Sequence, residues 1–198
     1  MKTLIRNRAG FLVMVVFMFA SAHAYAQGGR SVVFARKGDV IKNSLPQATN
    51  FFVKKVILSD RDKAKIKAQG SFSPQVSQVK FFYGEDAAQD LVGTVLFNRM
   101  VTSDGTIEVG IAFTPGGTVS NVVVTRAASR MKPWIEAAVS AGVVKNLIGL
   151  GSDAMSDPMK NISESELGAR AYTMAKVITA AVIHGVVYYD ILFKPLQQ

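Results

Sequence analysis

Four strand-like segments joined by short turns constrain the fold of this chain most strongly. Each segment is rich in the β-branched and aromatic residues that favour strands. The sequences S-D-G at 103–105 and P-G-G at 115–117 are strong turn signals between them. Consecutive strands with such short connections pair antiparallel. The sequence therefore predicts an antiparallel β-meander built from residues 76–83, 91–101, 106–113 and 119–125.

Two helical segments follow the predicted meander. Residues 133–147 begin with a proline, which suits the first turn of a helix, and place small and apolar residues near one face. A last helix is predicted from Ser163 to about residue 188, with Ser163 and Glu166 at the spacing of a capping box. The fold class expected is α+β: an antiparallel β-meander sheet packed against two C-terminal helices, in a single domain.

The segment before the meander is expected to add shorter elements. Residues 31–35 and 51–58 are apolar enough for strands. Pro46, two residues after Ser44, predicts a helix that begins at Ser44 with the proline in its first turn. Ser59, followed by acidic residues, predicts a short helix that stops at Gly70.

The N-terminal 26 residues have the layout of a secretory signal peptide. A basic start is followed by an apolar run at 11–20, about half the length that a membrane-spanning helix needs. Ala24-Tyr25-Ala26 places small residues at the positions required for cleavage after Ala26. We therefore expect a periplasmic or secreted protein. Its parts are expected to be a signal peptide at 1–26, a leader with one strand at 27–43, and the main domain at 44–198.

The composition excludes several kinds of chemistry. The chain has no cysteine, so it has no disulfide, thiolate metal site or covalent c-type haem. One of its two histidines lies in the predicted signal peptide, which leaves His184 alone and without partners for a catalytic triad. With 23 Lys and Arg against 14 Asp and Glu, the chain suits anionic ligands, partners or membranes. Any chemistry is therefore expected to come from a bound group.

Several stretches carry a resemblance to a known family. They are K-V-I-L-S-D at 55–60, G-T-V-L-F at 93–97, T-I-E-V-G-I-A-F at 106–113 and the aromatic Trp134 after the sheet. In this order they resemble the FMN-binding domain of periplasmic subunits in Rnf and Na⁺-translocating NADH:quinone reductase complexes. The resemblance covers roughly residues 45–186. It implies that domain's fold and a role in electron transfer.

The family's flavin-attachment motif is altered in this chain. The motif is Ser/Thr-Gly-Ala-Thr at the start of the last helix, where the threonine hydroxyl can be esterified to the flavin phosphate. Here the matching residues are E-L-G-A-R-A at 166–171, so Gly168 and Ala169 fit and Arg170 replaces the threonine. An ester is impossible at an arginine. The resemblance thus implies FMN held non-covalently, with Arg170 on its phosphate.

Two hypotheses about function stay open. In the first, the protein is a flavin electron carrier for a membrane or periplasmic redox complex, with Gly168, Ala169 and Arg170 at the phosphate and the loop residues Thr114 and Thr118 lining the ring or ribityl chain. In the second, the fold is a cofactor-free scaffold or assembly subunit of such a complex. Glutamates 164 and 166 favour the second, because carboxylates repel a phosphate.

A third possibility is a stand-alone enzyme, but the sequence contains no recognisable catalytic constellation. Another anionic cofactor such as haem stays open in place of FMN. Trp134 and Tyr172 could stack on an isoalloxazine ring or belong to the core. Peripheral contact with a membrane is expected from the basic surplus, whereas no nucleic-acid partner is expected. The apolar C-terminus around Phe193 is expected to pack in the core, with docking against a partner as the alternative.

Overall fold

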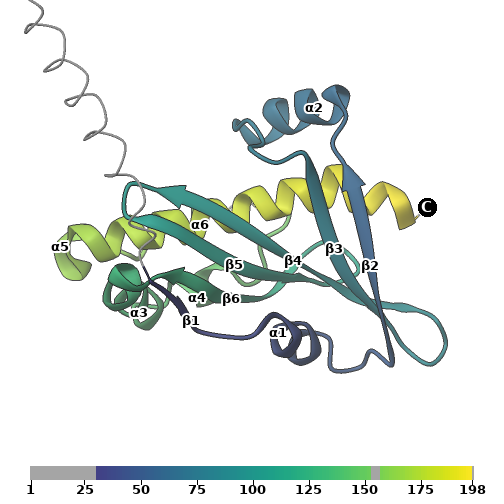
Figure 1. Ribbon diagram of the computed structural model, residues 1–198, viewed down its shortest axis with the longest axis horizontal. Coiled ribbons are helices and arrows are strands. Elements are labelled where there is room, and N and C mark those ends of the chain that lie inside the picture. Colours follow the sequence, from purple (N-terminus) through teal and green to yellow (C-terminus); the bar gives the residue numbers. More distant parts are fainter. Residues whose placement is uncertain (1–29, 153–156, 198) are drawn as a thin grey trace, which may run out of the picture. The chain divides into compact units, whose positions relative to one another are not determined.

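Six antiparallel strands form one sheet in the order β1-β6-β5-β4-β3-β2 (Figure 1). The computed structural model describes residues 30–152 and 157–197, so the predicted signal peptide and its cleavage position lie outside the described residues. The strands are β1 (Ser31–Val33), β2 (Asn50–Ile57), β3 (Gln78–Glu85), β4 (Leu91–Thr102), β5 (Gly105–Phe113) and β6 (Val119–Ala128).

Strands β2 to β5 each pair with the next strand along the chain, which confirms the predicted meander. β1 completes the sheet at the other edge, where Ser31 pairs with Ala128 and Val33 with Arg126. Residues 31–43 therefore belong to the same compact unit as the rest of the described chain. The predicted α+β class with an antiparallel sheet is confirmed.

Helices lie on both faces of the sheet. The helices are α1 (Lys37–Ser44), α2 (Asp60–Gly70), α3 (Lys132–Ser140), α4 (Val143–Leu147), α5 (Glu164–Leu167) and α6 (Ala169–Tyr188). We call the face that packs against α6 the inner face; its buried side chains form the main core. The opposite, outer face is covered in part by α1, where Val40 and Leu45 pack with Val95 and Ala112. The long C-terminal helix is visible behind the sheet (Figure 1).

The short helix α2 begins and ends where its sequence predicts. The Asp62 backbone N–H donates to the Ser59 hydroxyl at 3.1 Å, and the Ser59 N–H donates to the Asp62 carboxylate at 3.1 Å. This reciprocal capping box satisfies N–H groups that the helix leaves unpaired. The Ser59 hydroxyl also donates to the Asp62 carboxylate at 2.6 Å, and this side-chain hydrogen bond is the largest cause that holds the pKa of Asp62 below its ordinary value.

The helix predicted to begin at Ser44 is wrong, because a helix ends there instead. α1 runs from Lys37 to Ser44, and Leu45 closes it with its backbone N–H on the Ile41 carbonyl at 3.1 Å. Pro46 follows the end of the helix, a position where proline is common because it cannot continue the helical hydrogen bonds. A proline two residues after Ser44 is therefore compatible both with a helix that begins at Ser44 and with a helix that ends there.

Two predicted helices are each divided by a glycine. The helix expected at 133–147 is α3 followed by α4, with Gly142 between them at φ 91°. The last helix is α5 followed by α6, and Gly168 joins them at φ 79° and ψ 148°. Residues with a side chain rarely adopt these backbone angles, whereas glycine adopts them readily. Each glycine therefore divides a helix in two, although the apolar sequence pattern continues past it. Ser163 caps α5 as predicted, accepting the Glu166 N–H at 3.4 Å.

A bulge changes the orientation of the first residue of β6. Simple alternation places Val119 on the face opposite Val122. In the structure the pairing of β5 with β6 shifts between Ala112 and Phe113, so that Val119 and Val122 are both buried in the main core. One extra residue on the bulged strand reverses the side on which the preceding side chains lie.

The C-terminal helical segment is long and apolar. Residues Ala169–Gln197 are sufficient in length and composition to cross a membrane. Buried residues of α6, among them Met174, Ile178 and Val182, instead pack in the main core against the sheet. A core helix of this kind passes the same test of length and hydropathy, so this feature does not indicate a membrane span.

Candidate functional site

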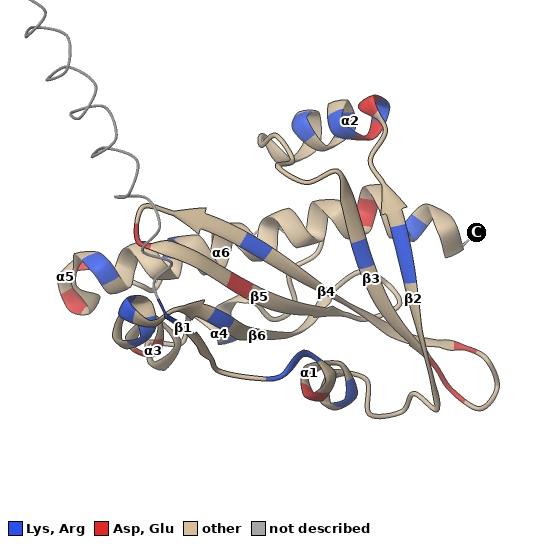
Figure 2. Ribbon diagram, viewed as in Figure 1, with Lys and Arg blue, Asp and Glu red and all other residues tan. Residues whose placement is uncertain are grey.

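The described residues hold little material for catalysis by side chains alone. Over residues 30–152 and 157–197, no three His, Asp or Glu side chains are grouped so that they could hold a metal ion. Basic residues are spread over the strands and α2, with few acidic residues between them (Figure 2).

His184, on α6, is packed rather than placed for catalysis. Its imidazole stacks on the Phe72 ring with 3.5 Å between centroids. Burial lowers the pKa of His184, because a low-dielectric environment disfavours the charged imidazolium.

The depressed pKa of His184 predicts a pH dependence of stability. The unfolded chain takes up a proton near the ordinary histidine pKa of about 6.5, where the folded protein still resists protonation. The free energy of unfolding should therefore reach its full value above that pH, and it should decrease as the pH falls below it. Urea unfolding at about pH 7.5 and 5.5 measures this change. The loss should be smaller in His184→Gln, and an equal loss in both proteins would show that His184 does not cause it.

The N-terminus of α6 offers unpaired backbone donors. The Tyr172 N–H is the first to bond back, to the Gly168 carbonyl at 2.9 Å. The N–H groups of Ala169, Arg170 and Ala171 therefore have no partner within the helix, as at any helix start. A Cβ placed on Gly168 would meet no atom of the described residues within 4 Å. Unpaired donors at a helix start suit an anion.

Arg170 and Trp134 lie together at this end of α6. The Arg170 guanidinium carbon is 4.6 Å from the centroid of the Trp134 ring, within the range of a cation–π interaction. Trp134 belongs to the first turn of α3, which packs along α6. The indole is partly buried and the arginine is exposed. The fold thus brings a cation, an aromatic ring and unpaired N–H groups to one place.

Thr114 and Thr118 lie elsewhere, in the turn between β5 and β6. The Thr118 N–H donates to the Thr114 hydroxyl at 3.2 Å, so these side chains shape the turn itself. The turn contacts the far end of α6, where the Tyr189 hydroxyl donates to the Pro115 carbonyl at 2.9 Å. Burial raises the pKa of Tyr189, which keeps this hydroxyl protonated as a donor.

The predicted site residues therefore fall into two separate groups. α6 has 20 residues, so its ends are about 30 Å apart. Gly168, Ala169 and Arg170 lie at one end, and Thr114 and Thr118 lie beside the other. One flavin mononucleotide is too short to contact both groups. The expectation that all five residues line one ligand is corrected, because the β5–β6 hairpin reaches the C-terminal end of the helix.

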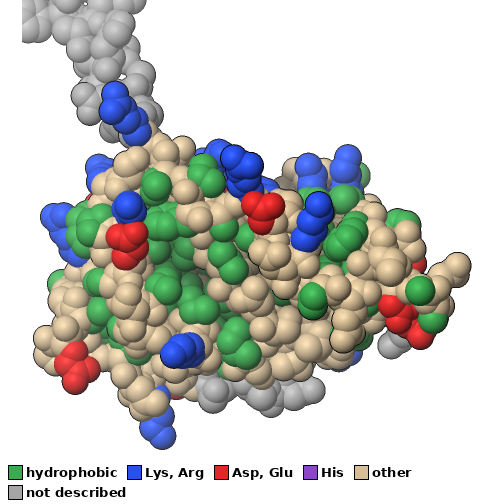
Figure 3. Space-filling model, turned by 90° about the horizontal axis from the view of Figure 1, so that it is seen from below, with side chains coloured by type: hydrophobic (Ala, Val, Ile, Leu, Met, Phe, Trp, Pro, Cys, Tyr) green, Lys and Arg blue, Asp and Glu red, His purple; other side chains and the backbone are tan. Residues whose placement is uncertain are grey.

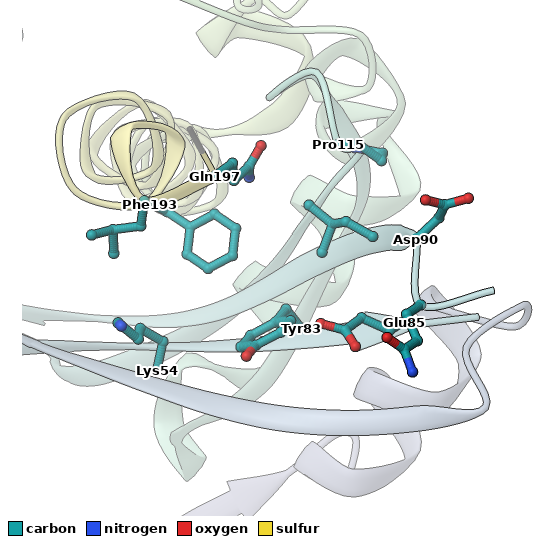
Figure 4. A pocket seen from close by; sticks show the side chains of 10 residues that line it. Lys54, Tyr83, Glu85, Asp90, Pro115, Phe193 and Gln197 are labelled. Carbon is teal, nitrogen blue, oxygen red and sulfur yellow. The ribbon is translucent and has the colours of Figure 1, made fainter. Parts of the chain in front are cut away.

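A cleft of about 520 Å³ lies beside the β5–β6 turn. Tyr83 lies near its centre, with Lys54 at one end and Glu85 and Asp90 at the other (Figure 4). Two carboxylates against one ammonium disfavour a phosphate in this cleft. No sequence pattern indicated this cleft, which is lined by Lys54, Tyr83, Glu85, Gln89, Asp90, Leu91, Pro115, Phe193, Leu196 and Gln197. Its walls come from strand ends and the C-terminus, which no local motif connects.

A second, apolar groove of about 330 Å³ runs between β6 and α3. Apolar side chains gather on the side of the molecule that carries α1, α3 and β6 (Figure 3). Glu136 is the only charged residue that lines the groove, so it offers nothing to an anionic ligand. The N-terminus of α6 is therefore the arrangement that best fits the predicted phosphate.

Comparisons of this chain with protein-family models, with curated proteins and with solved structures found no match.

Proposed function

We propose that this protein is a periplasmic or secreted electron-transfer protein that binds FMN non-covalently at the N-terminus of α6. The observation that carries the proposal is the meeting of Gly168, Arg170 and Trp134 at one place. These residues belong to the stretches that resemble the FMN-binding domain. The flavin supplies the ability to accept and release electrons, and the protein supplies binding, orientation and electrostatics.

The phosphate group would be held by backbone and side chain together. The unpaired N–H groups of residues 169–171 and the partial positive charge of the helix end favour an anion. Gly168 has no side chain, and this permits close approach to the backbone. Arg170 adds charge-assisted hydrogen bonds to the phosphate, whereas the threonine of the family motif holds the phosphate through an ester bond. These donors fit a phosphate that is bound but not covalently attached.

The stacking of Arg170 on Trp134 supports this role. The guanidinium carbon lies 4.6 Å from the Trp134 ring centroid, and a guanidinium over an aromatic ring can still donate its N–H groups to a ligand. Arg170 forms no ion pair among the described residues, so those donors have no carboxylate partner there. The arginine is therefore oriented before any ligand arrives, which reduces the entropy lost on binding.

A cofactor-free scaffold or assembly subunit is the second candidate. Glu164 and Glu166 lie in α5, directly before the helix that would receive the phosphate, and both are exposed. Their negative charges weaken the attraction of this helix end for an anion. In the scaffold role, the same fold would present its basic surface to a membrane or periplasmic redox complex.

Arg170 gives a direct test of the binding proposal. We expect Arg170→Ala to weaken FMN binding by about tenfold or more, because a hydrogen bond to a charged group contributes about 1.5–3 kcal/mol. Retention of flavin by protein purified from a flavin-replete host measures this loss. Acid denaturation should release the flavin into the supernatant, as expected for a non-covalent cofactor.

Thr118→Val is the matched control for this test. Thr118 lies at the far end of α6, so its replacement should leave flavin retention unchanged. Equal losses in the two variants would contradict the site at Arg170. A protein that neither carries flavin nor takes up added FMN would leave the scaffold as the remaining candidate.

A further inference from the structure

Strands β3 and β4 separate along part of their length and leave a hollow in the sheet. Their pairing runs only from Phe81 opposite Leu96 to Glu85 opposite Leu91. Beyond Phe81 the two strands diverge (Figure 1). The hollow between them measures about 260 Å³ and is lined by Lys37, Val76, Gln78, Val79, Lys80, Phe82, Leu96, Phe97, Asn98, Arg99 and Tyr188. It lies beside α1 and is unrelated to the N-terminus of α6.

The charged residues of this hollow are all cations. Lys37, Lys80 and Arg99 line it, and no carboxylate does. Lys37 is already bound to Glu108 at 2.7 Å. Lys80 and Arg99 are exposed and form no ion pair within the described ranges. A smaller hollow beside it, of about 220 Å³, shares Arg99 and adds Arg126 and Glu108. Glu108 lies opposite both Arg99 and Arg126 across the strands, so one carboxylate faces several cations and a net positive charge is left here.

One pair of lysines repels across the neighbouring strands. Lys55 on β2 lies directly opposite Lys80 on β3, so both side chains extend from the outer face. Like charges in directly opposed positions destabilise a sheet. An anion placed near this pair would relieve the repulsion, and both lysines are exposed to one. The outer face is thus arranged for a negatively charged partner, and Figure 2 shows the basic residues on these strands.

Large apolar side chains are exposed on the same face. Ile57 and Val101 are each 78% exposed, and Val53 is 52% exposed. Ile57 and Val53 share the outer face with Lys55, and Val101 shares it with Arg99, because alternate residues of a strand lie on one side. Phe51, 44% exposed, shares this face, and Phe82 and Phe97 line the hollow, so aliphatic and aromatic side chains together form an apolar border around the cations.

We propose that the hollow between β3 and β4 binds the phosphate of an anionic phospholipid headgroup while the surrounding aliphatic side chains rest in the bilayer. Basic residues attract the negatively charged lipid surface, and apolar side chains add burial at the level of the headgroups. Lys80 and Arg99 hold the phosphate, and Ile57, Val53 and Val101 contact the acyl boundary. The bilayer is thereby placed against the outer face of the sheet.

Vesicle co-sedimentation tests this proposal with the chain from Gln27 onward. We expect the protein to bind vesicles of phosphatidylcholine mixed with phosphatidylglycerol, and to bind pure phosphatidylcholine at least tenfold more weakly. The double variant Lys80→Glu, Arg99→Glu should lose at least tenfold in binding to the mixed vesicles. Lys145→Glu is the matched control, since Lys145 is exposed on α4 and its reversal should leave binding unchanged.

A second variant and a competitor separate the parts of the proposal. Ile57→Ser with Val101→Ser should weaken binding to the mixed vesicles while leaving the cations in place. Both side chains are exposed, so thermal unfolding should confirm that every variant is folded. Equal binding to neutral and anionic vesicles, or unchanged binding by the charge-reversed protein, would overturn the proposal. Binding of inorganic phosphate or a nucleic acid without vesicle binding would overturn it as well.

Discussion

Replacing Phe81 with alanine is expected to lower the free energy of unfolding by about 4 kcal/mol. Phe81 is fully buried on the inner face of β3, and its ring lies 5.0 Å from the ring of Phe193, centroid to centroid. Truncation removes the contacts between the sheet and the C-terminal segment and leaves a cavity in a tightly packed core. Urea unfolding followed by circular dichroism measures the change.

Phe51→Ala is the control for this prediction. Phe51 lies on the adjacent strand β2 and is 44% exposed, so the same substitution removes much less buried surface. We expect its loss to stay below about 1.5 kcal/mol, since the hydrophobic contribution scales with the apolar area buried. Similar losses at Phe81 and Phe51 would contradict the assignment of inner and outer faces.

The second large effect is expected from Gly185→Val. A Cβ at position 185 would lie 2.6 Å from the Ile111 Cδ1 atom, so any side chain there must displace the buried Ile111 side chain or move α6 away from β5. Overpacking of a buried site of this kind costs about 1–3 kcal/mol. The helix has little freedom to move, because Ala181 and Val182 are also buried against the sheet. Thermal unfolding of the variant measures the loss.

Gly38→Val in α1 is the matched substitution at an open position. A Cβ on Gly38 would meet no atom within 4 Å, and the residue is exposed. Replacing a helical glycine here should leave stability unchanged or raise it slightly. If the valine at 185 is tolerated as well as the valine at 38, then α6 does not pack on β5 as closely as described.

Strands and turns were predictable from the sequence because their signals are local. The S-D-G turn before Ile107 and the capping box of Ser59 and Asp62 each act within a few residues, and both are found in the structure. The start of α1 carries no such signal, since Arg36 provides no side-chain cap. Pro46 suggested a helix start because proline is common in the first turn of a helix. Proline is also common just after a helix ends, so this signal is ambiguous.

The candidate site was predictable only in part, for a physical reason. The motif around Gly168 is contiguous in sequence, so Arg170 could be proposed as a phosphate ligand without a structure. Its contact with Trp134 depends on how α3 packs against α6. Thr114 and Thr118 were assigned to the wrong end because the register of β5 and β6 decides which end of the helix their turn contacts. Distances of this kind come from packing rather than from local pattern.

Fluorescence of Trp134 during titration with FMN tests the central claim most directly. Trp134 is the only tryptophan in the chain, so its emission reports on this site alone. We predict saturable quenching by FMN, and weaker quenching by riboflavin, which has the same ring but no phosphate for Arg170 and the helix end to bind. Quenching by FMN that is no stronger than by riboflavin, or that is unchanged in Arg170→Ala, would contradict the proposed flavin site.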